Sequence, residues 1–109
     1  MSGLEAFQSL DLRVGRVGRA EVNEKARKPA YRLWIDFGPL RVKQSSAQIT
    51  DLYTPDDLTG RLVVAAVNLG SRSIAGFVSE VLVLGLPDGH EHVVLLAPER
   101  DVPLGNRVY

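Results

Sequence analysis

Three stretches of the chain show the periodicity of β-strands. Residues 31–37 alternate between apolar and polar side chains, which predicts a strand with one buried face. Residues 11–22 form a longer, β-branched stretch in which Gly15 and Gly18 interrupt the alternation. Glycines at such positions are typical of a bulge or a sharp bend, as at the corners of small barrels. Residues 62–67 are continuously apolar, which predicts a strand covered on both faces.

Shorter apolar runs between turn residues predict the remaining strands. Gly38 and Pro39 mark a hairpin turn after the alternating strand. Residues 68–77 are rich in Gly and Ser, which predicts a loop. The further strands predicted on this basis are residues 40–44, 78–86 and 93–96.

Two segments carry the signature of a helix start. Ser2 and Glu5 have the spacing of a capping box and predict an opening helix over residues 3–10. Ser45–Gln48 has the same spacing and predicts the start of a second helix, within residues 45–59.

The order of these elements indicates a fold class. Five main strands with a helix between the third and the fourth is the order of the OB-fold, a partly open five-stranded Greek-key barrel. We therefore expect an all-β protein with short helices. Residues 1–109 are expected to form one domain, because that length suffices for one hydrophobic core.

The distribution of charge adds a functional hint. The segment from Arg13 to Lys43 contains nine of the thirteen Lys and Arg residues and three acidic residues, so its net charge is +6 although the chain is neutral. A basic segment on a neutral protein indicates a local site for an anion, most often a nucleic-acid backbone. Charge alone leaves a merely solvated face as the alternative.

Composition excludes several kinds of site. The chain has no cysteine, which excludes disulfides, thiolate metal sites and cysteine nucleophiles. No apolar run approaches the roughly 20 residues of a membrane span, and no signal peptide is recognisable after Met1. We therefore expect a cytoplasmic protein without membrane insertion.

Catalytic chemistry has little support. His90 and His92 flank Glu91, but two histidines without a third ligand are more typical of a solvated hairpin tip than of a metal site. No glycine-rich phosphate loop and no nucleophile beside a base is evident. We expect no catalytic residue, no metal, no cofactor and no enzymatic activity.

Several segments resemble a known family. Asp11–Val17 resembles the opening strand of the tRNA-binding domains appended to methionyl-tRNA synthetases and found in EMAP II-like proteins, and Asn68–Ser79 resembles their loop between strands 4 and 5. Ile35–Gly38, Lys43–Ile49 and Ser79–Leu84 narrow the resemblance to the CsaA-like members. The resemblance implies an OB-fold that binds tRNA, and for the CsaA-like members an export-related chaperone that forms a homodimer.

The chain departs from the broader family at two places. Lys25–Ala30 stands where a His-Pro-x-Ala-Asp-x-Leu segment is usual, and Val81 replaces the usual Gly or Ala two residues after the loop serine. Both departures agree with the CsaA-like branch.

An OB-fold binds nucleic acid on strands 2 and 3 and on the loops that join strands 1–2 and 4–5. Basic and polar side chains are expected on that surface, because Arg and Lys bind phosphate and Arg also stacks on bases. The residues predicted to bind tRNA or another structured RNA are Arg27, Lys28, Arg32, Trp34, Arg41, Lys43, Ser45, Ser46, Asn68, Arg72, Ser73 and Ser79.

Two of these residues have a purely structural alternative. Trp34 is either a stacking platform for a base or a side chain covered by a partner subunit or by the N-terminal helix. Ser45 either only caps the predicted helix or also contributes, beside Lys43, to an anion site at the helix start.

A second functional class stays open beside RNA binding. An export-related chaperone would bind unfolded or preprotein peptides through an apolar groove of the dimer. Ile74 and Phe77 form an apolar stretch in a polar loop and are its candidate contacts, although Phe77 is equally suited to begin a strand and plug the barrel end. A homodimer is expected because Leu4 and Phe7 leave the N-terminal helix with exposed apolar surface.

Overall fold

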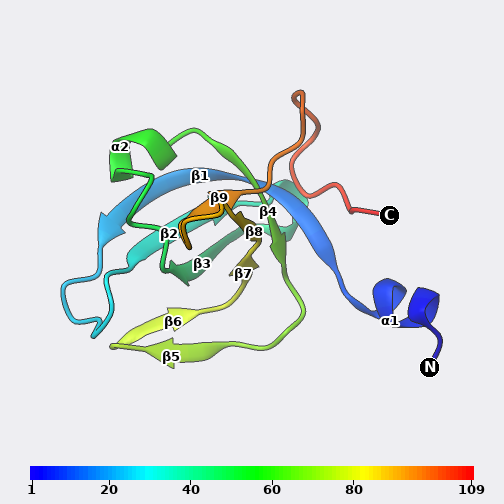
Figure 1. Cartoon of the computed structure of the whole chain (residues 1–109). Coiled ribbons are helices and arrows are strands. Elements are labelled where there is room, and N and C mark those ends of the chain that lie inside the picture. Colours follow the sequence, from blue (N-terminus) through cyan, green and yellow to red (C-terminus); the bar gives the residue numbers. More distant parts are fainter.

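The computed structural model describes residues 1–109 and contains one five-stranded antiparallel sheet that curls into a nearly closed barrel (Figure 1). Its strands are β1 (Leu12–Val22), β2 (Tyr31–Asp36), β3 (Val42–Ala47), β4 (Leu62–Ala66) and β7 (Leu82–Val83). Their order across the sheet is β3-β2-β1-β4-β7. The mostly-β, OB-like barrel expected from the sequence is therefore confirmed.

Hydrogen bonds from β3 to the segment before β7 complete the barrel. The carbonyl oxygen of Gln44 accepts the backbone N–H groups of Glu80 at 2.8 Å and of Val81 at 3.3 Å. The hydroxyl of Ser45 donates to the carbonyl oxygen of Val81 at 2.9 Å. These contacts partner the outer edge of β3, which would otherwise expose unpaired backbone groups.

Alternate residues of the β2 segment fill the barrel. Leu33, Ile35 and Phe37 have no exposed surface, and they pack with Val17 and Val63, which are equally buried. Burying each such side chain stabilises the fold by about 1.5–3 kcal/mol. The residues between them, Trp34 and Asp36, are more exposed, so the alternation predicted for this strand is confirmed.

The strand β1 takes part in two sides of the barrel. Its first half, from Leu12 to Arg16, pairs with β4, and its second half pairs with β2. The pairing with β2 shifts by one residue between Val17 and Arg19, at Gly18. The bend predicted from the glycines is confirmed, because a bulge increases the local twist of a strand.

The two helices agree only partly with the sequence patterns. Helix α1 (Gly3–Ser9) begins with the predicted capping box, in which the Ser2 hydroxyl accepts the N–H group of Glu5 at 3.1 Å. Helix α2 (Pro55–Leu58) lies within the predicted range. Its cap is Thr54, whose hydroxyl accepts the N–H group of Asp57 at 3.1 Å.

The capping box predicted at Ser45 is wrong. Ser45 lies inside β3, where it pairs with Leu33 of β2. A serine followed by a glutamine at the third position satisfies the local signature of a helix start. Pairing with β2 along the whole of β3 overrides this signature, because a strand at that position completes the sheet over the core.

The segment after β4 contains more strands than predicted. The predicted loop contains β5 (Arg72–Ile74), which forms a hairpin with β6 (Phe77–Ser79). The predicted strand 78–86 is divided among β6, β7 and β8 (Gly85–Pro87), and β8 pairs with β9 (Val93–Leu95). The hairpin of β5 and β6 extends from the barrel toward the loop between β1 and β2 (Figure 1).

Short elements complete the chain. A single turn of 3-10 helix, η1 (Gly38–Leu40), forms the predicted turn between β2 and β3. Helix α1 buries none of its residues and stands at the edge of the molecule (Figure 1). None of the helices is long and apolar enough to cross a membrane.

Candidate nucleic-acid interface

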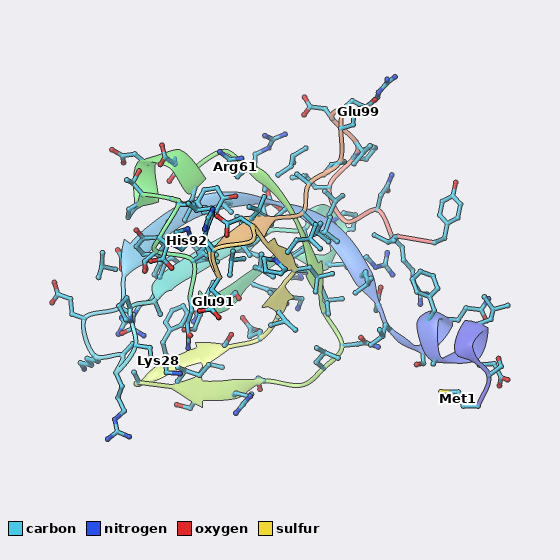
Figure 2. The ribbon with its side chains drawn as sticks, viewed as in Figure 1. Met1, Lys28, Arg61, Glu91, His92 and Glu99 are labelled. Atoms are coloured by element: carbon cyan, nitrogen blue, oxygen red, sulfur yellow. The ribbon has the colours of Figure 1, made fainter.

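A groove of about 490 Å³ lies between the β1–β2 loop and the tip of the β5–β6 hairpin. One wall is the basic loop, with Lys25, Arg27 and Lys28. Ile74 and Ala75 form the opposite wall, and Ser46 at the end of β3 and Gln48 just after it supply a polar floor. Figure 2 shows Lys28 on the loop, beside the end of the hairpin. This is the place at which an OB-fold binds nucleic acid.

Asn23 holds the basic loop in shape. Its backbone N–H group donates to the carbonyl oxygen of Ala30 at 2.9 Å, and its carbonyl oxygen accepts the N–H group of Ala26 at 3.2 Å. The side-chain oxygen of Asn23 accepts the backbone N–H group of Lys25 at 3.2 Å and a guanidinium N–H group of Arg32 at 3.3 Å. Asn23 is only 3% exposed, so these bonds are shielded from water. The loop therefore presents its cations from a fixed backbone.

The hairpin wall has a tight turn at its tip. Ile74 pairs with Phe77, and Ala75 and Gly76 form the two-residue connection. Their φ angles are 51° and 79°, both in the left-handed region. A turn with two such residues matches the twist of a β-hairpin and normally contains Asn, Asp or Gly. Ala75 is therefore an unusual residue at this position.

Cations and aromatic rings connect the outer sheet face to this hairpin. The guanidinium of Arg32 lies 5.2 Å from the ring centre of Phe77, and Phe77 meets Trp34 edge to face at 5.4 Å. The guanidinium of Arg19 lies 4.5 Å from the ring centre of Trp34. Arg32 also binds Asn23, so it links both walls of the groove.

These contacts bear on the two roles predicted for Trp34, a stacking platform for a base or a side chain covered by a partner subunit or by the N-terminal helix. Phe77 and Arg19 of the same chain both contact the ring of Trp34, and helix α1 buries none of its own residues. The half-buried ring of Trp34 is therefore already in contact with two side chains of its own chain. Phe77 is 6% exposed and packs on the sheet, so it is not available as the peptide contact predicted for it.

Two side chains that were predicted to bind RNA make hydrogen bonds to other parts of the protein instead. Ser45 is 1% exposed and donates its hydroxyl to Val81, so it cannot reach a ligand. The side-chain oxygen of Asn68 accepts the N–H group of Asp11 at 2.9 Å, and its amide donates to the carbonyl oxygen of Ser9 at 2.9 Å. Asn68 thus fixes the junction between α1 and β1, which explains an asparagine at the start of this segment.

A smaller recess of about 270 Å³ lies along the hairpin and contains Ser46, Arg72 and Ser79. The Ser79 hydroxyl accepts the backbone N–H group of Ser46 at 3.0 Å, so it helps to join β3 to β6. Arg72 and Ser73 are exposed on β5. Of these four, Ser46 also lines the larger groove.

Arg41 and Lys43 lie away from the groove. They stand at the η1 end of β3, whereas the groove meets its other end, and the five residue steps from Val42 to Ala47 span about 16 Å. Lys43 pairs with Ile35 and so lies on the core side of the sheet, opposite to the face of Trp34. The predicted cations are therefore not one compact cluster.

Five residues that line the groove were not predicted, and three of them bear on its chemistry. Lys25 belongs to the same basic loop as Arg27 and Lys28, so the charge run could have identified it. Gln48 was hidden by the incorrect capping box at residues 45–48, which gave it the role of a capping side chain. Ala75 carries no chemical signal, and only the turn geometry distinguishes it.

The histidine pair belongs to another part of the molecule. The Asp88 carboxylate accepts the backbone N–H groups of His90 at 2.7 Å and of His92 at 3.1 Å. The bond from His90 is the main reason why the pKa of Asp88 is lowered. No group of three or more His, Cys, Asp or Glu residues that could hold a metal ion occurs in the structure.

Comparison with known proteins identifies the family. A family model described as "Putative tRNA binding domain" matches residues 12–107. The chain is 41% identical over 106 residues to a methionine–tRNA ligase of Archaeoglobus fulgidus, which covers 96% of this chain and 16% of that protein. The chain thus spans about a sixth of the length of such relatives.

Two solved structures match along their whole length. The first, described as the chaperone CsaA of Bacillus anthracis, has a TM-score of 0.93 and 51% identity, and the match covers 100% of this chain and 99% of the other. The second, the CsaA chaperone protein of Picrophilus torridus, has a TM-score of 0.92 and 41% identity, with 100% of both chains covered.

Proposed function

This chain belongs to the tRNA-binding domain family, as a module of the CsaA and methionyl-tRNA synthetase type, and from this membership we propose that it grips tRNA through the groove between the β1–β2 loop and the β5–β6 hairpin. The contact is made mainly with the phosphate backbone. The module has no catalytic activity of its own and acts in the cytoplasm as a binding protein.

One observation carries this proposal. The groove is lined by Lys25, Arg27 and Lys28, and none of its lining residues is acidic. All three cations are exposed, so their charges are available to an anion rather than used within the fold. Contacts between cations and phosphates supply most of the affinity for nucleic acid and release condensed counterions.

The test is the salt dependence of tRNA binding. The affinity of a fluorescent bulk tRNA is measured by anisotropy between 50 and 300 mM salt for the native chain and for Arg27→Ala and Lys28→Ala. Each variant is expected to bind more weakly and to lower the slope of log affinity against log salt by roughly 0.7–0.9, the contribution of one phosphate contact.

Arg100→Ala is the matched control. Arg100 is also an exposed arginine, and it lies beside Glu99 in the loop that Figure 2 shows on the other side of the molecule from Lys28. Its removal changes the net charge equally but should leave the salt slope unchanged. If Arg27→Ala and Arg100→Ala lose equal tRNA affinity, binding depends only on the net charge of the protein. That result would refute the proposal that tRNA binds in the groove.

A homodimer is the second part of the proposal. On helix α1, Leu4, Phe7 and Leu10 are 66%, 39% and 40% exposed, and Val108 and Tyr109 are exposed as well. Such apolar surface is normally covered, most often by a twofold contact with a second copy. Phe7→Asp is expected to convert a dimer into a monomer in light scattering at micromolar concentration, while Gln8→Asp is not. A native chain that is already monomeric there would contradict the proposal.

Peptide binding is a second candidate function, since related structures are described as chaperones. A largely apolar groove of about 500 Å³ supports it, lined in part by Leu12, Val64, Leu84 and Val102. This groove takes the place of Phe77 as the candidate peptide site. Binding of an unfolded client peptide that persists in high salt, and that Val64→Asp abolishes without loss of tRNA affinity, would establish this function.

A further inference from the structure

We propose that the groove holds one unpaired nucleotide, with its phosphate on the basic loop and its base against the hairpin wall. The inference rests on the proposed RNA-binding function and specifies the part of the RNA that enters the groove. It assigns Gln48, whose place beside the groove the sequence did not reveal, to the recognition of the base edge.

The size of the groove is the first argument. Its volume of about 490 Å³ lies within the range of about 300–1,000 Å³ that holds a small organic ligand. A base in an RNA helix cannot enter such a recess, because the major groove is deep and narrow and the bases are stacked and paired. A nucleotide of a loop, a bulge or a chain end is free to leave the stack and insert its base.

The lining has the three kinds of surface that a nucleotide requires. Lys25, Arg27 and Lys28 supply positive charge on the loop side. Across the groove, Ile74 and Ala75 offer apolar contact for the faces of a base. Between them, the exposed side chain of Gln48 provides one donor group and one acceptor, the combination that pairs with the edge of a base.

The backbone at Ala75 is the second argument. A residue with a Cβ atom is strained in the left-handed region relative to glycine, and Ala75 has a φ of 51°. Glycine or asparagine would relieve this strain at the same position. Alanine instead places a methyl group in the lining of the groove, and backbone strain of this kind is concentrated at ligand sites.

The third argument is that both walls are held in place before any ligand binds. Arg32 joins Asn23 at the base of the loop to Phe77 at the start of β6, through a hydrogen bond of 3.3 Å and a ring contact of 5.2 Å. A rigid recess loses little conformational entropy when a ligand enters. A merely electrostatic surface would not require this bracing.

Short RNAs without secondary structure test the inference directly. The affinities of oligo(A), oligo(C) and oligo(U) hexanucleotides are measured against an RNA duplex of twelve base pairs with blunt ends. Labelled bulk tRNA is titrated in parallel. At least one hexanucleotide should compete with tRNA, the three should differ in affinity, and the duplex should compete more weakly per phosphate.

Gln48→Leu isolates the recognition of the base, because leucine has a similar size and lacks the amide. It should lower the affinity for the preferred hexanucleotide roughly two- to tenfold, the effect of one hydrogen bond, and should reduce the differences among the three. The salt slope should stay unchanged, since no phosphate contact is lost. Gln8→Leu is the matched control on exposed helix α1 and should change neither value.

The outcomes separate this inference from the proposed function. If tRNA binds with the expected salt slope but the duplex competes as well as the hexanucleotides, the nucleotide site is refuted and backbone binding stands. The same follows if Gln48→Leu and Gln8→Leu behave alike. If neither tRNA nor any hexanucleotide binds, both proposals fall.

Discussion

Replacing Gly15 with alanine is expected to destabilise the barrel, whereas the same change at Gly18 is not. A Cβ atom on Gly15 would lie 2.6 Å from Cγ2 of Ile35 and 2.8 Å from two ring carbons of Phe37. Carbon atoms in favourable contact are about 3.5–4.0 Å apart, so both neighbours would have to move by about 1 Å. Neither has any exposed surface, and both belong to the central core cluster.

The expected loss follows from two opposing effects. Forcing one extra carbon into a packed core costs about 1–3 kcal/mol. Alanine also restricts the unfolded chain, which returns roughly 0.4–1 kcal/mol of stability. The free energy of unfolding of Gly15→Ala should therefore fall by about 1–2 kcal/mol. In a domain of this size such a loss lowers the melting temperature by about 4–9 °C.

Gly18→Ala is the control within the same strand. A Cβ atom there would meet only the carbonyl oxygen of Trp34, at 3.8 Å, which is an ordinary contact. Neither glycine has a positive φ, so the backbone itself accepts alanine at both positions. Urea unfolding followed by circular dichroism should rank Gly18→Ala at or slightly above the native chain and Gly15→Ala well below it. Native stability of Gly15→Ala, or a greater loss at Gly18, would refute this account of how β1 packs.

Three further predictions concern side chains that shape the barrel and its groove. Ser45→Ala should reduce the free energy of unfolding by about 0.5–1.5 kcal/mol in urea titrations, because the carbonyl oxygen of Val81 loses its shorter hydrogen bond and keeps only the one from the Ser79 hydroxyl at 3.5 Å; an unchanged midpoint would contradict the buried bond. Ala75→Gly should raise the melting temperature yet weaken hexanucleotide binding, and a gain in both would contradict its place in the groove. The pKa of Asp57 is lowered from 3.8, mainly because its carboxylate accepts the backbone N–H group of Thr54. The stability that the ionised carboxylate contributes is therefore present above pH 3.8 and is lost as the pH falls through the folded pKa. The stability difference between the native chain and Asp57→Asn should therefore shrink between pH 5 and pH 2, and a constant difference would refute the assignment.

The sequence identified the barrel and the family because those signals are local. Alternation in β2 shows which side chains enter the core, and the glycines of β1 mark the bend that lets one strand pair on two sides. The failure at Ser45 has the opposite cause. Its capping signature is a local preference, whereas pairing with Leu33 and the bond to Val81 involve residues distant along the chain. Long-range pairing supplies more stability than a cap, so the strand forms.

The candidate site likewise combines features that the sequence shows with features that only the folded structure determines. Sequence alone located the positive charge, since Arg27 and Lys28 lie in a run that composition reveals. It could not show that Lys43 faces the core side, which depends on strand register, or that Asn68 is used to fix helix α1. Nor could it bring Gln48 and Ala75 to the basic loop, because the barrel's closure places the hairpin there. Charge is a property of residues along the chain, and it is therefore read directly; a groove is a property of distances between segments, and only the folded chain determines those.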